Sequence, residues 1–456
     1  MKRIPPSRLR ADAVPDEVKA VLRRLGEAGH RSWLVGGVVR DLLLSRVRHD
    51  PGEFDLATPA TPDQVQRLFR KVVPTGIEHG TVTVLEGSAR VEVTTFRGEA
   101  DYLDGRRPSR VTFHGDLEAD LARRDFTINA MAWDPLAGEL RDPFGGRADL
   151  ARKRIRAVGT ARERFGEDGL RPLRAVRFVS QLGCELAPAT RRAIPAALPV
   201  VAQVSRERVA EELSRLLVGP HAAQGLRALS ATGLLSVVLP RLGTMPAERI
   251  RHALAVASEP FPSCAGREDG DRDRCRLLRL AALLHVLPPE EALQSVVELR
   301  LPNRVATAVV TLSGARRGLD DGPPPGLDGD GVEVRRFLSA AGREHAPLLL
   351  DLWTADARHQ GPRSARRVAE VTRLRSRVSA ELRRNPPLAV ADLALGGTDV
   401  MEILGTPGGR EVGEGLRHLL DAVLLDPAAN TRAGLSGHLR DWWQARRGRG
   451  PDSVPG

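Results

Sequence analysis

Apolar and polar residues follow two different periods, and the change from one to the other divides the chain near residue 165. Before that point, short runs typical of β-strands lie at residues 32–35, 81–85 and 90–96. Residues 16–28 predict an amphipathic helix. Its apolar side is formed by Val18, Val21, Leu22 and Leu25.

Helical periodicity dominates after residue 165, and strand patterns almost vanish. The period is clear over residues 209–217 and again over 277–284. Two stretches rich in proline, glycine and charge, 258–274 and 318–331, are predicted breaks between helices. The pattern therefore predicts an α+β protein, with a mixed sheet and its helices first and an all-helical part after it.

The length and composition agree with a soluble protein of several domains. The chain has 456 residues, and this length is more than one compact core usually holds. Hydrophobic residues make up 41% and charged residues 28%, as is typical of a soluble globular protein. No apolar run is long enough to span a membrane, and no secretory signal opens the sequence. The three cysteines, Cys184, Cys264 and Cys275, lie apart without a CxxC motif. We therefore expect no zinc site, no disulfide scaffold and a cytoplasmic location.

The first segment with recognisable chemistry reads LVGGVVRD over residues 34–41. A strand that runs into Gly36 and Gly37 and then into a helix lets backbone amides approach a phosphate. Arg40, one turn along that helix, is placed to reach the same anion. Farther on, Glu53 and Asp55 are separated by one residue, so both carboxylates point to one face of a strand. Such a pair suits a divalent metal ion, although solvated strands also carry such pairs.

Two further segments read DLARRDFTINAM over residues 120–131 and EDGLRPLRAVRF over residues 167–178. Taken together and in this order, the motifs resemble the class II tRNA nucleotidyltransferase and poly(A) polymerase family. The resemblance is close from about residue 30 to residue 240 and weaker to Asn430. It implies a polymerase-beta-type nucleotidyltransferase head over 1–150, a helical neck over 151–240, and a helical body and tail over 241–445. The end of the chain, 446–456, is expected to be disordered because of its terminal position.

The resemblance also implies roles for single residues. The incoming triphosphate would be held by Gly36, Gly37 and Arg40. Two Mg²⁺ ions would be held by Glu53 and Asp55, with Glu92 either a third catalytic carboxylate or an exposed strand residue. Ribose and phosphate would be bound by Arg123, Arg124, Asp125 and Asn129. The base edge would be read by Asp168 and Arg171, with Arg174 and Arg177 reaching phosphates.

Two departures from the family pattern stand out. Glu53 replaces the usual aspartate, and the preceding segment, 45–52, is about three residues longer than is typical. The extra methylene shifts the oxygen ligands by about an ångström, to which octahedral Mg²⁺ is sensitive. Asp50 is an alternative ligand, but its register with Asp55 argues against it. The second departure is Pro172. Proline is tolerated only in the first turn of a helix or at a kink, so we expect this helix to begin near Gly169.

The resemblance favours complete CCA addition to tRNA from CTP and ATP, with no obligate protein partner evident. Residues 76–84 look like the tRNA-maturing branch. Residues 96–111, which include the only tyrosine, Tyr102, resemble the loop with which CCA-adding enzymes switch from C to A. The alternatives are CC-only addition, A-only addition, poly(A) synthesis, and RNA binding by a head that has lost activity. The RNA-binding alternative is motivated by Glu53, which replaces the usual aspartate.

His285 lies in the apolar segment LLHV, where some relatives carry a His-Asp metal pair of a phosphohydrolase domain. Valine follows the histidine here. We therefore expect a structural histidine on an apolar helix rather than a hydrolase site.

The positive charge is concentrated at two places. The net charge is +11, and 65 of the 69 basic residues are arginine, which GC-rich codon usage also produces. Residues 151–177 and 363–384 each carry a net charge of +6, so the rest of the chain is nearly neutral. Codon usage does not explain the clustering. We interpret the first cluster as a nucleotide and tRNA-acceptor site and the second as a surface for the tRNA body, with a solvated helix face as the alternative.

Overall fold

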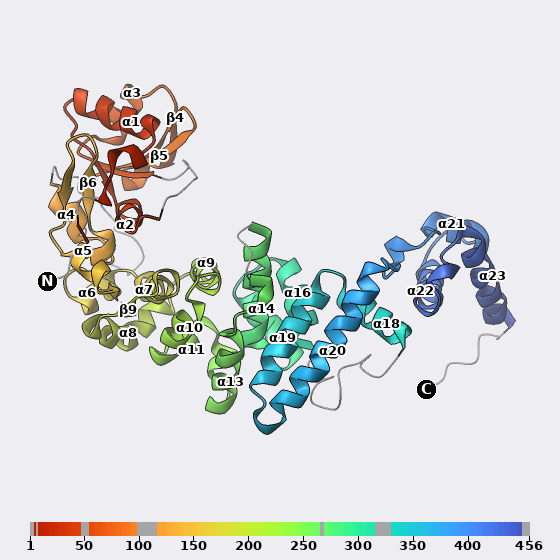
Figure 1. Cartoon of the computed structure of the whole chain (residues 1–456). Coiled ribbons are helices and arrows are strands. Elements are labelled where there is room, and N and C mark those ends of the chain that lie inside the picture. Colours follow the sequence, from red (N-terminus) through yellow and green to blue (C-terminus); the bar gives the residue numbers. More distant parts are fainter. Residues whose placement is uncertain are drawn as a thin grey trace. The chain divides into compact units, whose positions relative to one another are not determined.

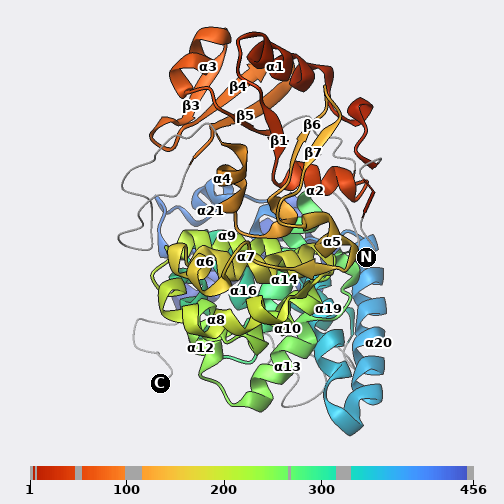
Figure 2. The same ribbon diagram turned by 90° about the vertical axis from the view of Figure 1, so that its left-hand side faces the viewer.

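The computed structural model divides the chain into two compact units. Met1–Thr244 and Glu298–Arg300 form the first, and Met245–Val297 and Leu301–Gly456 form the second. Figures 1 and 2 show the elements of both. The structure describes residues 4–5, 8–46, 54–97, 116–264, 269–314 and 330–448.

A seven-stranded mixed sheet forms the centre of the first unit, with the order β3-β4-β5-β2-β1-β6-β7. The pair β2–β5 is parallel and its neighbours are antiparallel. The mixed sheet predicted from the sequence is confirmed. The strands are β1 (Trp33–Val35), β2 (Phe54–Thr58), β3 (Val72–Gly76), β4 (Thr81–Glu86), β5 (Ala89–Thr95), β6 (Ala132–Asp134) and β7 (Glu139–Arg141).

Alternating burial along β5 gives the sheet one packed face and one open face. Ala89, Val91 and Val93 are buried, whereas Arg90 and Glu92, which alternate with them, are exposed. Residues two apart on a strand point to the same side, so the apolar set enters the core and the polar set faces outward. Farther along the strands, the other face is covered by a buried cluster of Trp33, Val35, Ala57, Phe96, Leu121 and Ala132.

Short helices accompany the sheet. The sequence predicts a helix over residues 16–28, and α1 spans Asp16–Glu27 and buries the four apolar residues expected on its inner side. The other helices of this part are α2 (Gly37–Leu43), α3 (Pro62–Leu68), α4 (Leu117–Ala122) and α5 (Gly146–Ala151), with 3₁₀ turns η2 (Ala11–Ala13), η3 (Ile77–His79) and η4 (Thr127–Asn129).

Helices complete the first unit, together with a two-stranded parallel sheet of β8 (Arg154–Ile155) and β9 (Glu185–Leu186). Helix α7 begins at Leu170 with Gly169 before it, so Pro172 lies in the first turn, as the sequence predicts. Helix α9 buries the apolar residues whose helical spacing was noted over residues 209–217. The helices are α6 (Ala161–Glu167), α7 (Leu170–Leu182), α8 (Pro188–Val201), α9 (Arg206–Leu217), α10 (Ala222–Ala231), α11 (Leu234–Val238) and α12 (Pro240–Gly243).

The second unit is helical throughout its described residues. Its elements are α13 (Ala247–Ala257), η5 (Pro262–Cys264), α14 (Asp269–Leu284), α15 (Pro289–Glu298), α16 (Asn303–Gly314), α18 (Gly331–Ala341), α19 (His345–Arg358), η6 (Gly361–Arg363), α20 (Ser364–Arg383), η7 (Val390–Asp392), α21 (Gly397–Leu404), α22 (Arg410–Leu425), η8 (Pro427–Ala429) and α23 (Arg432–Gly448). Helix α14 begins inside the predicted break 258–274, which is therefore shorter than expected. Most of the other predicted break, 318–331, lies outside the described residues, as does nearly all of the expected disordered end. Among the described residues, no helix has the length and apolar character that crossing a membrane requires.

Two segments near the end of the chain, 392–399 and 430–432, meet in space. Arg432 at the start of α23 donates to Asp399 of α21. Asn430 accepts from the backbone of Ala394 at 2.8 Å and donates to the carbonyl of Asp392 at 2.9 Å. These contacts hold the ends of α21 and α23 around a small apolar core.

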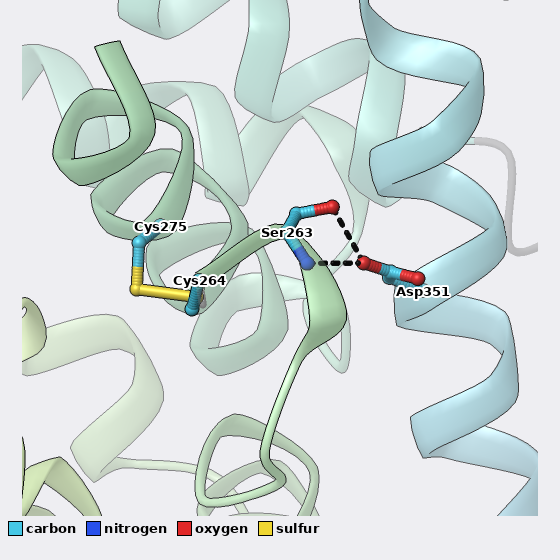
Figure 3. Close-up of a disulfide and its surroundings, with 4 residues drawn as sticks. All are labelled: Ser263, Cys264, Cys275 and Asp351. Atoms are coloured by element: carbon cyan, nitrogen blue, oxygen red, sulfur yellow. Dashed lines mark hydrogen bonds between the residues drawn. A yellow bond between two sulfur atoms is a disulfide. The ribbon is translucent and has the colours of Figure 1, made fainter. Parts of the chain in front are cut away.

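A disulfide joins Cys264 of η5 to Cys275 of α14, with the two Cα atoms 4.8 Å apart (Figure 3). The adjacent Ser263 fixes η5 on its other side, because its hydroxyl donates to Asp351 of α19 at 2.6 Å. The expectation that the cysteines form no disulfide was wrong. Spacing alone does not reveal that η5 and the second turn of α14 lie side by side, with the two thiols in contact.

Removing this disulfide should weaken the second unit. The sulfurs close a loop with a sequence separation of 11 residues. The chain-entropy estimate for such a loop is about 3 kcal/mol. We expect Cys275→Ser to lower the free energy of unfolding by up to that amount, measured by urea denaturation without reductant. Dithiothreitol should bring the wild type to the level of the variant and leave the variant unchanged. A wild type insensitive to dithiothreitol would contradict the prediction.

Candidate active site

Gly36 lies where the strand β1 enters the helix α2, and its backbone has a φ of 74°. This left-handed conformation strongly favours glycine. A Cβ atom there would lie 3.0 Å from Nη1 of Arg124 and 3.6 Å from Oδ2 of Asp55. The structure therefore brings the predicted phosphate-binding glycine, one predicted arginine and one predicted metal-binding carboxylate to a single point.

Asp55 and Glu92 are direct neighbours on the parallel strands β2 and β5. Both side chains are exposed, whereas the residues before and after each of them are buried. Neighbouring strands lie about 4.8 Å apart, so the two carboxylates stand side by side on the open face of the sheet. Glu53, the other predicted metal ligand, lies outside the described residues, as does Asp50.

Three arginines surround a fully buried carboxylate next to this face. Asp120 on α4 has an exposed fraction of 0% and forms ion pairs with Arg123 at 3.0 Å and Arg124 at 3.2 Å. Burial raises the pKa of Asp120, but the two guanidinium groups outweigh it and hold this pKa below its usual value. Arg97 lies in the same group, where burial and the charge of Arg123 lower its pKa to about 10. Three positive charges against one negative charge suit a polyanion such as a triphosphate.

Asp125 is held from three directions. Its Oδ1 accepts from the backbone amide of Phe126 at 2.8 Å and from Asn129 at 3.1 Å, and its Oδ2 accepts from Nε of Arg174 at 2.8 Å. Burial works to raise the pKa of Asp125, yet Arg174 and Asn129 lower it overall. The carboxylate therefore stays charged and joins α7 to the segment that follows α4.

Arg40 is buried and already engaged. Its Nη1 donates to Asn129 at 2.6 Å, and its Nε donates to Asp41 at 2.9 Å. These contacts connect α2 with η4. Triphosphate binding by Arg40 stays a prediction, and it would require this guanidinium to exchange a protein partner for phosphate.

Asp168 and Arg171 differ in accessibility. Asp168 is partly exposed, with Oδ1 accepting from the backbone of Leu170 at 2.9 Å. Arg171 is buried, and its guanidinium donates to the carbonyl oxygens of Arg164 at 2.9 Å and Arg123 at 3.1 Å. Asp168 therefore has the more accessible recognition group, whereas Arg171 holds the first turn of α7 against the chain next to α4.

Arg174 and Arg177 follow on the same helix. Arg174 reaches toward the sheet to Asp125, whereas Arg177 lies 2.8 Å from Glu212 of α9. Burial lowers the pKa of Arg177 to about 10 and raises the pKa of Glu212. Phosphate binding by these two arginines stays a prediction. In both views, α2 and α4 lie between the strands of the sheet and α7 (Figures 1 and 2).

Comparison with known proteins identifies this arrangement. Residues 32–156 match the poly A polymerase head domain, and residues 183–245 match the family described as a probable RNA and SrmB-binding site of polymerase A. The CCA-adding enzyme of Geobacillus stearothermophilus is 38% identical over 419 residues, which cover 91% of this chain and 94% of that enzyme. The chain belongs to the CCA-adding enzyme family. It is accordingly a nucleotidyltransferase of tRNA processing.

Solved structures agree with this CCA-adding family assignment. The crystal structure of the Bacillus stearothermophilus CCA-adding enzyme in complex with CTP has a TM-score of 0.72 and 34% identity, with 98% of this chain and 100% of that chain covered. The Thermotoga maritima CCA-adding enzyme complexed with tRNA_CCA has a TM-score of 0.62, with 97% and 99% covered. Its identity of 19% shows the fold alone. The polymerase-beta-type head followed by helices is thus confirmed for this family member.

Three charged residues of this site, Asp120, Arg97 and Glu212, received no individual role from the sequence. Asp120 positions Arg123 and Arg124, and its three- and four-residue spacing from them on a helix was a usable signal. Arg97 completes the positive group beside Asp120. Glu212 pairs with Arg177, but 35 residues separate them in the sequence. No local pattern reveals that contact.

The second basic cluster, residues 363–384, lies mainly on α20. Several of its arginines form ion pairs with carboxylates of the protein. Arg366 and Arg367 contact Glu370, and Arg375 contacts Asp351. Arg373 is exposed. Pairing lowers the net charge available to RNA, so binding of the tRNA body there stays a prediction. The loop around Tyr102 lies outside the described residues.

Proposed function

We propose that this enzyme adds CCA to the 3′ ends of tRNA, using CTP and ATP. The observation that carries the proposal is the meeting of Asp55, Glu92, Gly36 and Arg124 at one point of the sheet. Carboxylates that suit a cation and arginines that suit a triphosphate lie side by side there. Relatives that match most of the chain are CCA-adding enzymes, and one has a structure in complex with CTP.

The carboxylates fit a divalent cation, for which we propose Mg²⁺. Asp55 and Glu92 offer hard oxygen ligands on an exposed face, and Glu53 is two residues from Asp55 in the sequence. When bound, two Mg²⁺ ions would activate the tRNA 3′-hydroxyl and stabilise the departing pyrophosphate. The donor set is therefore chemically suitable.

The protein groups would orient and neutralise the nucleotide. Arg97, Arg123 and Arg124 would balance the charge of the triphosphate, while Gly36 leaves room for close approach. Asp125 and Asn129 would position the ribose. The tRNA 3′-oxygen forms a bond to the α-phosphorus, the bond from that phosphorus to the bridging oxygen breaks, and pyrophosphate leaves.

Asp168 would select bases that carry an exocyclic amine. Its partly exposed carboxylate can accept from N4 of cytosine or N6 of adenine, whereas the carbonyl oxygen of uracil at that position repels it. Arg171 would contribute by exchanging one of its backbone carbonyl partners for the base. The proposed template is thus a pair of side chains at the start of α7.

Removing the Asp168 carboxylate should relax nucleotide choice. We expect Asp168→Ala to reduce the preference for CTP over UTP by about tenfold to a hundredfold, corresponding to roughly 1–3 kcal/mol. The measurement is kcat/KM for each nucleotide on a tRNA that lacks CCA. Glu163→Ala, which removes an exposed carboxylate from α6, is the matched control. An unchanged CTP/UTP ratio in Asp168→Ala would rule out base reading by this residue.

The decisive assay uses purified enzyme, Mg²⁺, CTP, ATP and tRNA transcripts that end before CCA, after C or after CC. We expect every transcript to be extended to CCA and no further, which sequencing of the products checks. Products that stop at CC, extension only of the transcript ending in CC, or long A tails on unrelated RNA would each select a different family activity. Binding of tRNA without any extension would show that the head is inactive.

A further inference from the structure

A single aromatic ring lies against three arginines of the site. Phe178 of α7 has an exposed fraction of 3%, and its ring centroid is 4.3 Å from Cζ of Arg177 and 5.6 Å from Cζ of Arg174. Cζ of Arg40 on α2 is 5.2 Å from the same centroid. All three distances fall within the range of about 6 Å over which the face of a ring attracts a cation. One side chain therefore connects arginines from two helices.

The orientation of this ring is supported by a second phenylalanine. The ring of Phe126, which is fully buried, lies 5.8 Å from that of Phe178 between centroids, and the two ring planes make an angle of 84°. This edge-to-face arrangement is one that aromatic pairs prefer. Because both rings are enclosed by close-packed atoms, the Phe178 ring offers the arginines a surface of fixed direction.

The three arginines also have polar partners, which Asn129, Asp125 and Glu212 provide. These partners restrain the guanidinium groups one by one, whereas their positive charges, gathered around one ring, repel one another. Burial lowers the pKa of Arg177 to about 10, and the charge of Arg174 contributes to the fall. Arg177 nevertheless stays protonated at neutral pH, so the repulsion persists.

An aromatic ring offsets this repulsion without removing the positive charge. A carboxylate in the same place would attract the guanidinium groups, but it would also cancel charge that a triphosphate needs. An aliphatic side chain would fill the space without attracting a cation. The face of the ring attracts cations through its quadrupole and is no conventional hydrogen-bond acceptor. The N–H donors of each guanidinium therefore remain for carboxylates and phosphates.

We propose that Phe178 is a positioning residue for nucleotide binding. Its ring holds Arg40, Arg174 and Arg177 in the arrangement that receives the triphosphate. This role rests on the proposed function and on the predicted phosphate contacts of these arginines. Phe178 is buried and acts only through them. Arg40 can then give up Asn129 for phosphate while its guanidinium stays against the ring.

Calorimetric titration of the full chain with CTP in the presence of MgCl₂ tests this role. Phe178 is replaced by phenylalanines that carry one, two or three ring fluorines, which weaken the negative potential of the ring face and hardly change its size. We expect the dissociation constant for CTP to rise with each fluorine, by about tenfold over the series. ATP should lose affinity by the same factor, because the ring acts on phosphate-binding groups and not on the base.

Phe69 provides the matched control. It is a buried phenylalanine directly after α3, and Cζ of Arg24 lies 5.4 Å from its ring centroid. Fluorination there weakens the same kind of contact away from the site, so the dissociation constant for CTP should stay within about twofold. Phe178→Leu should weaken CTP binding at least as much as three fluorines do, whereas Phe69→Leu should not. Circular dichroism checks that each variant is folded.

Extension of tRNA by the same preparations separates this role from the proposed function. A wild type that binds CTP but extends no tRNA would contradict the proposed function, and the fluorine series would still decide the role of the ring. A dissociation constant that does not follow the number of fluorines, or a loss confined to one of the two nucleotides, would overturn the positioning role. A wild type that does not bind CTP would overturn both.

Discussion

Asp55→Asn should lower the rate of nucleotide addition on the order of a thousandfold while leaving the protein folded. The side chain is exposed on the sheet and lies in register with Glu92, so its replacement opens no cavity. Asparagine keeps the shape but removes the negative charge that would hold a divalent cation. The measurement is single-turnover incorporation of CTP into tRNA lacking CCA, with circular dichroism as the check on folding.

Asp63→Asn is the matched control for this prediction. Asp63 is an exposed aspartate on α3 of the same head, but it is outside the gathered site residues. Its replacement should leave the rate within about twofold. If Asp55→Asn kept a tenth or more of the wild-type rate, this carboxylate would not act at the reacting phosphate.

Asp125→Ala should have the largest effect on stability. It would leave Arg174 without its closest carboxylate and Asn129 without an acceptor. Loss of one partner of a buried pair costs about 3–5 kcal/mol, and the 32% exposed fraction of the Arg174 side chain lowers our expectation to about 2–3 kcal/mol. Urea denaturation at neutral pH measures the change, and the displaced Asn129 should reduce nucleotide addition as well.

A double-mutant cycle and a pH series test the cause. Arg174→Ala combined with Asp125→Ala should cost less than the sum of the two single changes, because either change alone breaks the pair. The pKa of Asp125 is lowered in the folded state. Its stabilisation is therefore complete above the unfolded pKa of about 3.9 and is lost as the pH falls through the folded pKa. Additive effects, or equal acid sensitivity in the wild type and Asp125→Ala, would contradict this explanation.

Patterns along the chain were sufficient to predict elements whose burial is periodic. The inner side of α1, the strands β4 and β5, and the start of α7 at Pro172 agree with prediction because each depends on neighbours a few residues away. Asp55 was identifiable as a candidate from its spacing to Glu53 on a strand, and Glu92 from the family resemblance. Their adjacency, however, depends on the parallel pairing of β2 with β5.

Contacts between distant segments were beyond such patterns. Arg40 and Asn129 are 89 residues apart, so no local pattern indicates that this arginine already binds a side chain within the protein. Asp356 of α19 meets His252 of α13 and His285 in the same way. Residue type indicates what a side chain can do, whereas the partners that restrain it are decided by tertiary packing.

Helix α7 has a consequence for any attempt to dissect the enzyme. Successive turns reach the carbonyl of Arg123, the carboxylate of Asp125 and Glu212 of α9. A fragment that ends at residue 150 would contain every strand of the large sheet yet lose Arg171 and Arg174, which reach the chain at Arg123 and the carboxylate of Asp125. The smallest autonomous catalytic fragment therefore has to extend through α7 and α9, and the head and the neck helices should unfold as one cooperative block.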